Sequence, residues 1–392
     1  MPDCASSRSP TADQSGVCSG SQAFLGKAKT AQLGQMPTEC LSPDGCHGLP
    51  LPVRLRLIRR ETRRLVNLLL DGNRSSERYR ATDLRVAALY SCCFGQKEPP
   101  SGNVSARLHH LWTRLASSSP PPVQIAEWRA VSIPCLPVGV SRSSYVAEIL
   151  EKAEEILLPA HRRGDVLTLA CHGSLSTEDY TGFSDADLIA VISDECLHDY
   201  DRLGKLESDF SRLNVFIRSA DPLAHHMVLV LSESDLGCYE ESLLPLAEWK
   251  RASLLLGEPA QCFRLVCCRD ESMRQLEHHS SKLDTAVRTP WECRLLLSRL
   301  FLIPAIYLQA LHGVYLGKRS ALLDAELFLP PFVLDALDAA SRVRTTWSRQ
   351  APPSHLPQEI LGRLPLIRRH FLAEVHRFWP VVLEAVLDGG EH

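Results

Sequence analysis

The sequence contains no Cys-x-x-Cys motif, although it has 14 cysteines in 392 residues. Such motifs hold zinc or form thioredoxin-like redox pairs, so their absence argues against both kinds of site. Cys40, Cys46 and His47 resemble half a metal site, but no second half follows. We therefore expect reduced thiols that are buried as small hydrophobic side chains.

A strong net charge and a long apolar run are also missing. A net charge of −3 gives no overall attraction to nucleic acid, so binding a polynucleotide would need a local basic patch. The most apolar stretch, residues 300–311, contains Pro304 and Gln309 and is too short to cross a bilayer. Residues 1–14 show no basic segment followed by an apolar core, which argues against a secretory signal. We expect a soluble, cytoplasmic protein without a membrane or nucleic-acid partner.

The composition that remains is that of an ordinary globular protein, with 45% hydrophobic and 23% charged residues. The chain is long enough for two or three domains. Residues 1–50 are rich in Ser, Gly, Pro and Thr and hold few large apolar side chains. Such a segment cannot bury enough apolar surface to offset the entropy of ordering it. We predict a disordered tail there.

Residues 51–122 predict a small helical unit followed by a linker. Leu55, Ile58 and Leu65 lie near one face of a helix, and arginines crowd the rest of residues 54–64. These arginines could bind nucleic-acid phosphates. No aromatic residues are interleaved for base stacking, so a solvated helix face is the favoured interpretation. Further helices are expected at 80–94 and 104–115, and the linker at 117–122.

Two carboxylates stand at the start of an apolar run in the middle of the chain. Asp185 and Asp187 precede residues 188–192, which predict a buried strand. Because side chains alternate along a strand, both carboxylates are expected on the same face. Close carboxylates repel each other unless a cation compensates their charge. Oxygen ligands of this kind suit Mg²⁺, which completes its octahedron with water and substrate phosphates.

A Gly-Ser turn precedes the two acids. Residues 166–171 predict a strand, which breaks at Gly173 and Ser174. The glycine lets backbone N–H groups approach a phosphate, and the serine adds a hydroxyl donor. The turn and the acids together predict a site that holds a metal-bound triphosphate.

This stretch, with Thr181-Gly182-Phe183-Ser184 before the acids, resembles the nucleotidyltransferase superfamily, which includes DNA polymerase β, aminoglycoside adenylyltransferases and poly(A) polymerases. It looks most like the small-molecule-modifying and minimal branches. The resemblance implies a mixed-sheet α/β nucleotidyltransferase domain at 123–268 and an all-helical C-terminal domain at 269–392. It also implies that Asp185 and Asp187 are catalytic magnesium ligands and that Gly173 and Ser174 bind the nucleotide.

The chain departs from the family pattern at the third carboxylate, which the family carries on a neighbouring strand. The candidate strand, residues 226–231, contains no acid. Glu233 and Asp235 lie just past its end, and His225 and His226 lie at its start. A histidine could replace the acid as base, because its pKa lies near neutrality, but a polar strand entry is the more common role of such a pair.

The remaining elements follow from periodicity and from Pro and Gly breaks. Helices are expected at 145–161 and 203–217, Asp235 should cap a helix that continues with breaks to residue 256, and a short strand should follow at 263–267. Four helices should follow, at 271–287, 291–311, 332–347 and 359–387, with kinks at Pro304, Pro365 and Pro380. In that region Lys318 and Arg319 could place a cation over a triphosphate. Arg342 and Arg344 are a second possible basic pair. For each pair, the favoured interpretation is that the residues are solvated or ion-paired on the surface.

The leading hypothesis is the transfer of a nucleoside monophosphate from an NTP to a hydroxyl of a small molecule or a protein, with Mg²⁺ at Asp185 and Asp187. A second hypothesis is a catalytically degenerate relative that binds nucleotide or a partner protein, which the missing strand acid favours. A third is RNA binding through the arginine-rich helix, which requires steep salt dependence.

Overall fold

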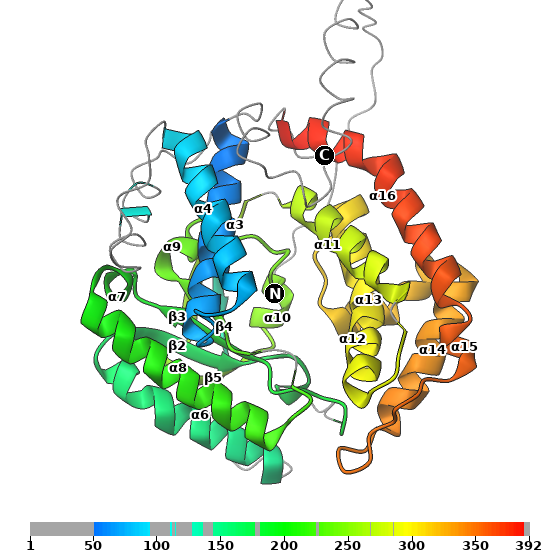
Figure 1. Ribbon diagram of the computed structural model, residues 1–392, viewed down its shortest axis with the longest axis horizontal. Coiled ribbons are helices and arrows are strands. Elements are labelled where there is room, and N and C mark those ends of the chain that lie inside the picture. The colour runs from blue at the N-terminus through cyan, green and yellow to red at the C-terminus, as the bar shows by residue number, and fades with distance from the viewer. Residues whose placement is uncertain are drawn as a thin grey trace, which may run out of the picture. The chain divides into compact units, whose positions relative to one another are not determined.

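The computed structural model describes residues 51–94, 110–111, 114, 128–135, 144–176, 181–224, 227–266, 268–284 and 286–387 (Figure 1). The predicted tail at 1–50 and linker at 117–122 lie outside these residues. The predicted helix at 104–115 is described only at positions 110, 111 and 114, all of which are helical. The described chain is mixed α/β and is helix-rich toward its C-terminal end.

A four-stranded mixed sheet forms the centre of the α/β part. Its order is β4-β3-β2-β5, where β2 is antiparallel to both β3 and β5 and β3 is parallel to β4. The strands are β2 Val166–Cys171, β3 Leu188–Ile192, β4 Leu229–Ser232 and β5 Ser253–Gly257. The bounds of β2 and β3 are those predicted from sequence. Every residue of β3 is buried, so the strand is covered on both faces.

The predicted helix that continues to residue 256 is wrong, because its last part is strand β5. The leucines there have high helix propensity, but pairing with β2 determines the outcome. Gly257 does not end a helix; it lies in β5 at φ +95°, and a Cβ there would lie 1.9 Å from the Leu167 carbonyl oxygen. The helices before it are short, α9 Glu233–Leu236 and α10 Leu246–Trp249.

The predicted role of Asp235 as a helix cap is also wrong. Ser232 is the N-cap of α9, and Asp235 is its partner at the third helical position in a reciprocal capping box. The Ser232 backbone N–H donates to the Asp235 carboxylate at 2.9 Å. The motif ends β4 and turns the chain directly into α9.

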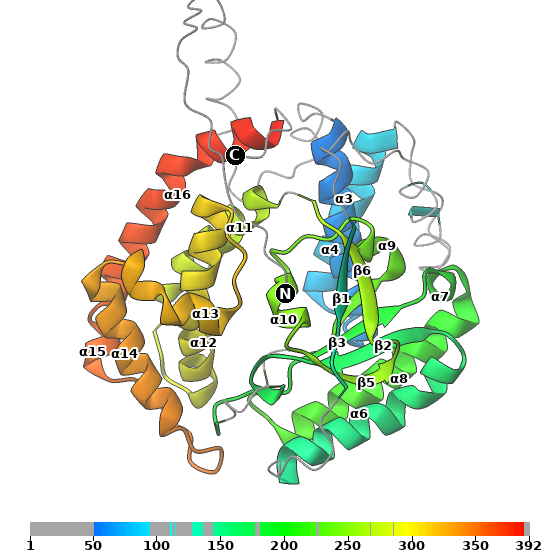
Figure 2. The same ribbon diagram turned by 180° about the vertical axis from the view of Figure 1, so that it is seen from behind.

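A second, two-stranded antiparallel sheet packs on one face of the first. It consists of β1 Trp128–Ser132, which the sequence did not indicate, and β6 Ala260–Arg264, which starts before the strand predicted at 263–267 (Figure 2). Val131 and Phe263 from this sheet share one hydrophobic core with Ile189 and Val191 of β3. Residues two apart on β3 thus face the same layer.

Helices α6 Ser144–Arg162 and α8 Tyr200–Ala220 lie side by side against the sheet (Figure 1), and the short α7 Asp194–His198 precedes α8. Both long helices confirm the predictions at 145–161 and 203–217. Ser193 and Asp199 cap α7 and α8 through bonds from backbone N–H groups to their side chains.

The two N-terminal helices, α3 Leu51–Leu70 and α4 Glu77–Phe94, form where the sequence predicts helices, and α3 covers the edge of the central sheet. The Asn67 side chain donates to the Val230 carbonyl and accepts from the Val230 N–H, both at 2.9 Å. One amide side chain therefore satisfies the backbone of edge strand β4.

The predicted solvated arginine face of α3 is wrong. Arg60 and Arg63 are buried, each 7% exposed. Arg60 pairs with Glu240 at 2.7 Å and with Asp270 at 2.9 Å, and Arg63 pairs with Glu240 and Asp235. Burial alone would lower the pKa of Arg60, but Asp270 and Glu240 outweigh it and raise that pKa. The Arg60 guanidinium in turn holds the pKa of Asp270 well below its usual range, although burial alone would raise that pKa.

The C-terminal part is helical, as predicted, and packs around one large hydrophobic core. Its helices are α11 Arg269–Ser281, α12 Pro290–Tyr307, α13 Lys318–Leu323, α14 Pro331–Thr345, α15 Gln358–Leu361 and α16 Leu364–Leu387. Pro304 and Pro380 lie inside α12 and α16 without ending them.

One apolar helix confirms the prediction at 291–311 to within one residue at each end. With the π-helical turn that follows α12, it runs from Pro290 to His312, long and apolar enough to span a membrane by length and composition. Of its most apolar window, 72% is buried inside the structure. This packing is that of a core helix and is consistent with a soluble protein.

Five of the nine described cysteines are buried. Cys135 and Cys262 are exposed, which differs from the prediction of buried thiols throughout. Burial raises the pKa of both Cys196 and Cys268 to about 12, so these two thiols stay protonated.

Candidate nucleotide-binding site

The turn after β2 packs directly against the second predicted aspartate. The His172 N–H donates to the Asp187 carbonyl at 2.9 Å, which holds the end of β2 beside the start of β3. Gly173 has φ +67°, and a Cβ there would lie 2.8 Å from Asp187 Oδ2. The backbone angle therefore favours glycine, and any larger residue would require the Asp187 carboxylate to shift. The Ser176 hydroxyl closes the turn by donating to the Gly173 carbonyl at 2.9 Å.

Asp185 takes part in a buried ion-pair network that joins the sheet to the C-terminal helices. Its Oδ1 accepts from Arg294 of α12, and both residues are buried. The same guanidinium donates to both oxygens of Asp221 at 3.0 Å and to the Phe183 carbonyl at 2.9 Å. Arg349 also pairs with Asp221, at 3.3 Å. Two carboxylates and two guanidiniums thus balance each other within the interior.

The segment before Asp185 is anchored by aromatic packing as well. Phe183 meets the rings of Trp347 and Phe301 edge-on, at centroid distances of 5.1 and 6.2 Å. A Cβ on Gly182 would lie 2.3 Å from the Trp347 carbonyl oxygen, so only glycine fits there. The residues between the turn and β3 therefore form part of the contact with the helical region.

Asp187 has a different environment. It is only half-buried, and its charge acts on the ammonium of Lys318 at the start of α13. Desolvation lowers the pKa of Lys318, and the carboxylates of Asp187 and Glu248 oppose that shift, while the residue as a whole is exposed. A Cβ on Gly317 would lie 1.6 Å from Glu248 Oε1, so α13 begins in close contact with this carboxylate.

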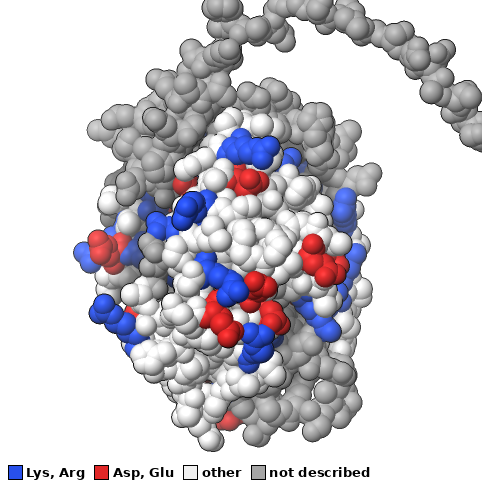
Figure 3. Space-filling view, turned by 90° about the vertical axis from the view of Figure 1, so that its right-hand side faces the viewer, with Lys and Arg blue, Asp and Glu red and all other residues white. Residues whose placement is uncertain are grey.

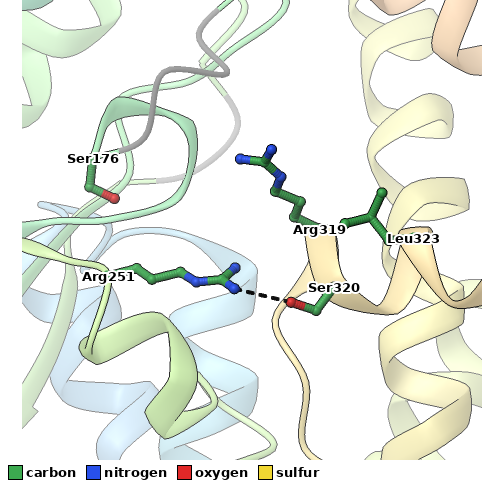
Figure 4. A pocket seen from close by; sticks show the side chains of 5 residues that line it. All are labelled: Ser176, Arg251, Arg319, Ser320 and Leu323. Atoms are coloured by element: carbon green, nitrogen blue, oxygen red, sulfur yellow. Dashed lines mark hydrogen bonds between the residues drawn. The ribbon is translucent and has the colours of Figure 1, made fainter.

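A pocket of about 380 Å³ lies between the Gly-Ser turn and α13. It is lined by Ser176, Arg251, Arg319, Ser320 and Leu323 (Figure 4). The Arg251 guanidinium donates to the Ser320 hydroxyl at 3.3 Å. Arg319, for which an ordinary surface role was the favoured prediction, thus lies on the same pocket as Ser176 of the Gly-Ser turn, and Arg251, which the sequence did not single out, joins it.

The second predicted basic pair is divided. Arg342 lies on the surface in ion pairs with Asp338 and Glu359. Arg344 stands over the Phe301 ring at 5.9 Å. Figure 3 shows acidic and basic side chains interspersed over the face of the C-terminal helices, and this mixed charge offers no continuous basic surface on that face.

No carboxylate on β4 faces the site. The parallel register pairs Leu229, the first residue of β4, with Ile189 near the start of β3, so the end of β4 nearest Asp187 is apolar. Glu233 and Asp235 follow the opposite end of β4, next to the end of β3, and bond to Asp194 and Ser232. His225 and His226, the candidate bases, lie outside the described residues.

The described residues fit a single magnesium ion better than a pair. Among the residues that the structure describes, no group of three or more His, Cys, Asp or Glu side chains is arranged to hold a metal. Arg294 already compensates the charge of Asp185, whereas Asp187 is half-buried beside the turn. One carboxylate with water and phosphate oxygens is a normal magnesium environment.

No protein-family model matches the chain, and neither the curated proteins nor the solved structures contain a match. The functional assignment therefore depends on the geometry of the site.

Proposed function

We propose that the chain is a magnesium-dependent nucleotidyltransferase that binds an NTP between the Gly173–Ser176 turn and α13. The observation that supports this most is the close approach of the Asp187 carboxylate to Gly173. This approach brings the two halves of the sequence motif together in space. The two residues lie at neighbouring ends of β2 and β3, in a mixed sheet whose order includes β4-β3-β2. Lys318 adds a positive charge opposite the carboxylate.

Each residue has a role in this proposal. Asp187 would hold one magnesium ion, and Gly173 and Ser174 would present backbone N–H groups and a hydroxyl to the phosphates. Magnesium, when bound, would neutralise phosphate charge and favour attack at the α-phosphate. Lys318 would compensate charge on the departing pyrophosphate. Asp185 would keep the acidic segment in place through Arg294.

The acceptor in this proposal is a hydroxyl of a small molecule or a protein, and the location is cytoplasmic. Arg60 and Arg63 of α3 are buried in ion pairs and so cannot contribute to an exposed basic face that binds a polynucleotide. This observation weakens the RNA-binding hypothesis.

A second candidate function is nucleotide binding without turnover. It is favoured by two observations: Asp185 is paired with Arg294, and β4, where a third carboxylate is expected, holds only Leu229, Val230, Leu231 and Ser232. In that case the site would retain NTP affinity and would release no pyrophosphate.

Calorimetry with ATP, GTP, CTP and UTP, with and without Mg²⁺, tests the proposal. We expect magnesium-dependent binding of at least one NTP by the wild type and its loss in Asp187→Asn. Glu195→Gln is the matched control, since Glu195 is 81% exposed at the opposite end of β3. A folded wild type that binds none of the four contradicts both candidate functions. Pyrophosphate release with hydroxyl acceptors then distinguishes transfer from binding alone.

A further inference from the structure

The pocket beside the Gly-Ser turn has a lining that suits an anion. Among the described residues that line it, Arg251 and Arg319 carry guanidinium groups, and Ser176 and Ser320 carry hydroxyls. None of the described lining residues is acidic. Guanidinium groups bind phosphate and carboxylate oxygens through paired, charge-assisted hydrogen bonds, and hydroxyls complete such a site.

The two arginines come from different parts of the chain. Arg251 stands between α10 and β5, whereas Arg319 belongs to α13 in the helical region. Figure 4 shows the Arg319 side chain extending toward the turn and the Arg251 side chain extending toward Ser320. Both arginines are exposed, and the bond from Arg251 to Ser320 connects the two sides of the pocket. An anion between them would contact both sides at once.

The pocket is adjacent to the proposed magnesium site but has different chemistry. Ser176 ends the turn that begins at Gly173, and Ser253, two residues after Arg251, pairs with Cys171 at the end of β2. Asp187 is not among the lining residues. A volume of about 380 Å³ exceeds the share of several water molecules in the liquid, each about 30 Å³. The volume is thus sufficient for a phosphate group.

We propose that Arg251, Arg319, Ser176 and Ser320 form an anion subsite that takes a phosphate-class group and does not require magnesium. Its use as a substrate subsite rests on the proposed nucleotidyltransferase function, whereas the binding of the anion does not. The group is either the terminal phosphates of the NTP or an anionic substituent of the acceptor.

Calorimetry with inorganic pyrophosphate, in EDTA and at low salt, tests the subsite. We expect the wild type to bind pyrophosphate, and Arg251→Met and Arg319→Met each to bind about tenfold or more weakly, because each loses charge-assisted hydrogen bonds. Arg212→Met, an arginine 63% exposed on α8, is the control for loss of one positive charge. Binding by both pocket variants at the wild-type affinity, or no binding by the wild type, overturns the proposal.

Asp187→Asn separates this proposal from the proposed function. We expect this variant to lose magnesium-dependent NTP binding and to keep pyrophosphate binding in EDTA. If pyrophosphate binding depends on Asp187 and not on the arginines, the subsite is wrong while the magnesium site stands. If the arginine variants lose pyrophosphate but no variant affects NTP binding, the subsite stands and the proposed function is wrong.

Competition identifies the source of the anion, and both outcomes support the subsite. Displacement of pyrophosphate by ATP but not by AMP assigns the pocket to the terminal phosphates. Simultaneous binding of pyrophosphate and magnesium-ATP assigns it to an acidic acceptor.

Discussion

Asp185 and Asp187 are separated by one residue but have opposite environments. Asp185 is buried against the Arg294 guanidinium, within a network that includes Asp221 and Arg349. Asp187 is half-buried, touches a glycine turn and acts on an exposed lysine. A buried carboxylate with a fixed guanidinium has its charge compensated permanently, whereas a half-buried carboxylate can still accept a cation or respond to a ligand.

The comparison shows that an Asp-x-Asp pair need not act as one unit. Both residues precede β3 instead of lying in it, so the alternation of a regular strand does not fix their directions. The contacts assign Asp185 to the connection with the helical region and Asp187 to the turn. Three substitutions test this division, in order of decreasing expected effect, and a fourth, at Asp71, examines a buried carboxylate elsewhere in the molecule for comparison.

Arg294→Met should have the largest effect on stability. It leaves Asp185 and Asp221 buried with reduced compensation, and loss of one partner of a buried pair costs about 3–5 kcal/mol. Chemical denaturation measures the change in the free energy of unfolding. Arg299→Met, on the same helix and only partly buried, should cost under about 1 kcal/mol. An equal loss in the free energy of unfolding from the two changes would show that the ion pair of Asp185 with Arg294 stabilises the fold no more than an ordinary surface contact.

Asp187→Asn should leave stability nearly unchanged and remove the stabilisation by ligand. At an NTP concentration 100 times the Kd, bound magnesium-NTP should add about 2.7 kcal/mol to the free energy of unfolding of the wild type. The variant should gain almost none of it. Thermal unfolding with and without magnesium-NTP measures the difference. A variant that keeps the full gain would show that Asp187 does not contact the ligand.

Gly173→Ala should be more damaging than the matched change Gly164→Ala. Gly173 has φ +67° and Gly164 has φ +75°. Placing alanine in this left-handed conformation should cost about 1–2 kcal/mol of stability at either position. A Cβ at Gly164 meets nothing within 4 Å, whereas at Gly173 it would meet Asp187 Oδ2 at 2.8 Å. We expect only Gly173→Ala to weaken magnesium-dependent NTP binding as well. Equal loss of stability with unchanged binding in both variants would contradict the role of this contact.

Asp71 gives the smallest effect and shows how a carboxylate behaves without a guanidinium contact. Burial raises its pKa to about 6, although Arg218 and the Asn214 amide oppose the shift. The folded state therefore holds a proton more tightly than the unfolded state, and stability should fall as pH rises from about 4 to about 6.

The Asp71 contribution should be about 1 kcal/mol, since partial exposure reduces it. Asp71→Asn should flatten this part of the stability curve. Urea denaturation at a series of pH values measures the slope, and an unchanged slope in the variant would assign it to other groups.

The strands around the site were predictable because their signals are local. Residues 166–171 and 188–192 are short apolar runs bounded by Gly and Asp, and each became a strand at the predicted bounds. Strand β5 was not predictable in this way, because a leucine run has high helix propensity and becomes a strand only through pairing with β2.

The ion pairs were not predictable because each joins residues far apart in the sequence. Arg60 meets Glu240 and Asp270 across separate elements, and Arg294 meets Asp185 in the same way. A usable signal existed for Arg294, since an arginine flanked by Cys293 and the run Leu295–Leu297 in an apolar helix requires an acidic partner if it is buried. The position of Arg319 beside the turn depends on how the helical region docks, which no local pattern encodes.

The most direct test of the central claim is the number of Mn²⁺ ions bound per chain in the presence of NTP, counted by electron paramagnetic resonance. Mn²⁺ serves as the spectroscopic substitute for Mg²⁺, and circular dichroism confirms that each variant is folded. The account predicts one ion for the wild type, one for Asp185→Asn and none for Asp187→Asn. Loss of the ion in folded Asp185→Asn, or two ions in the wild type, would contradict it.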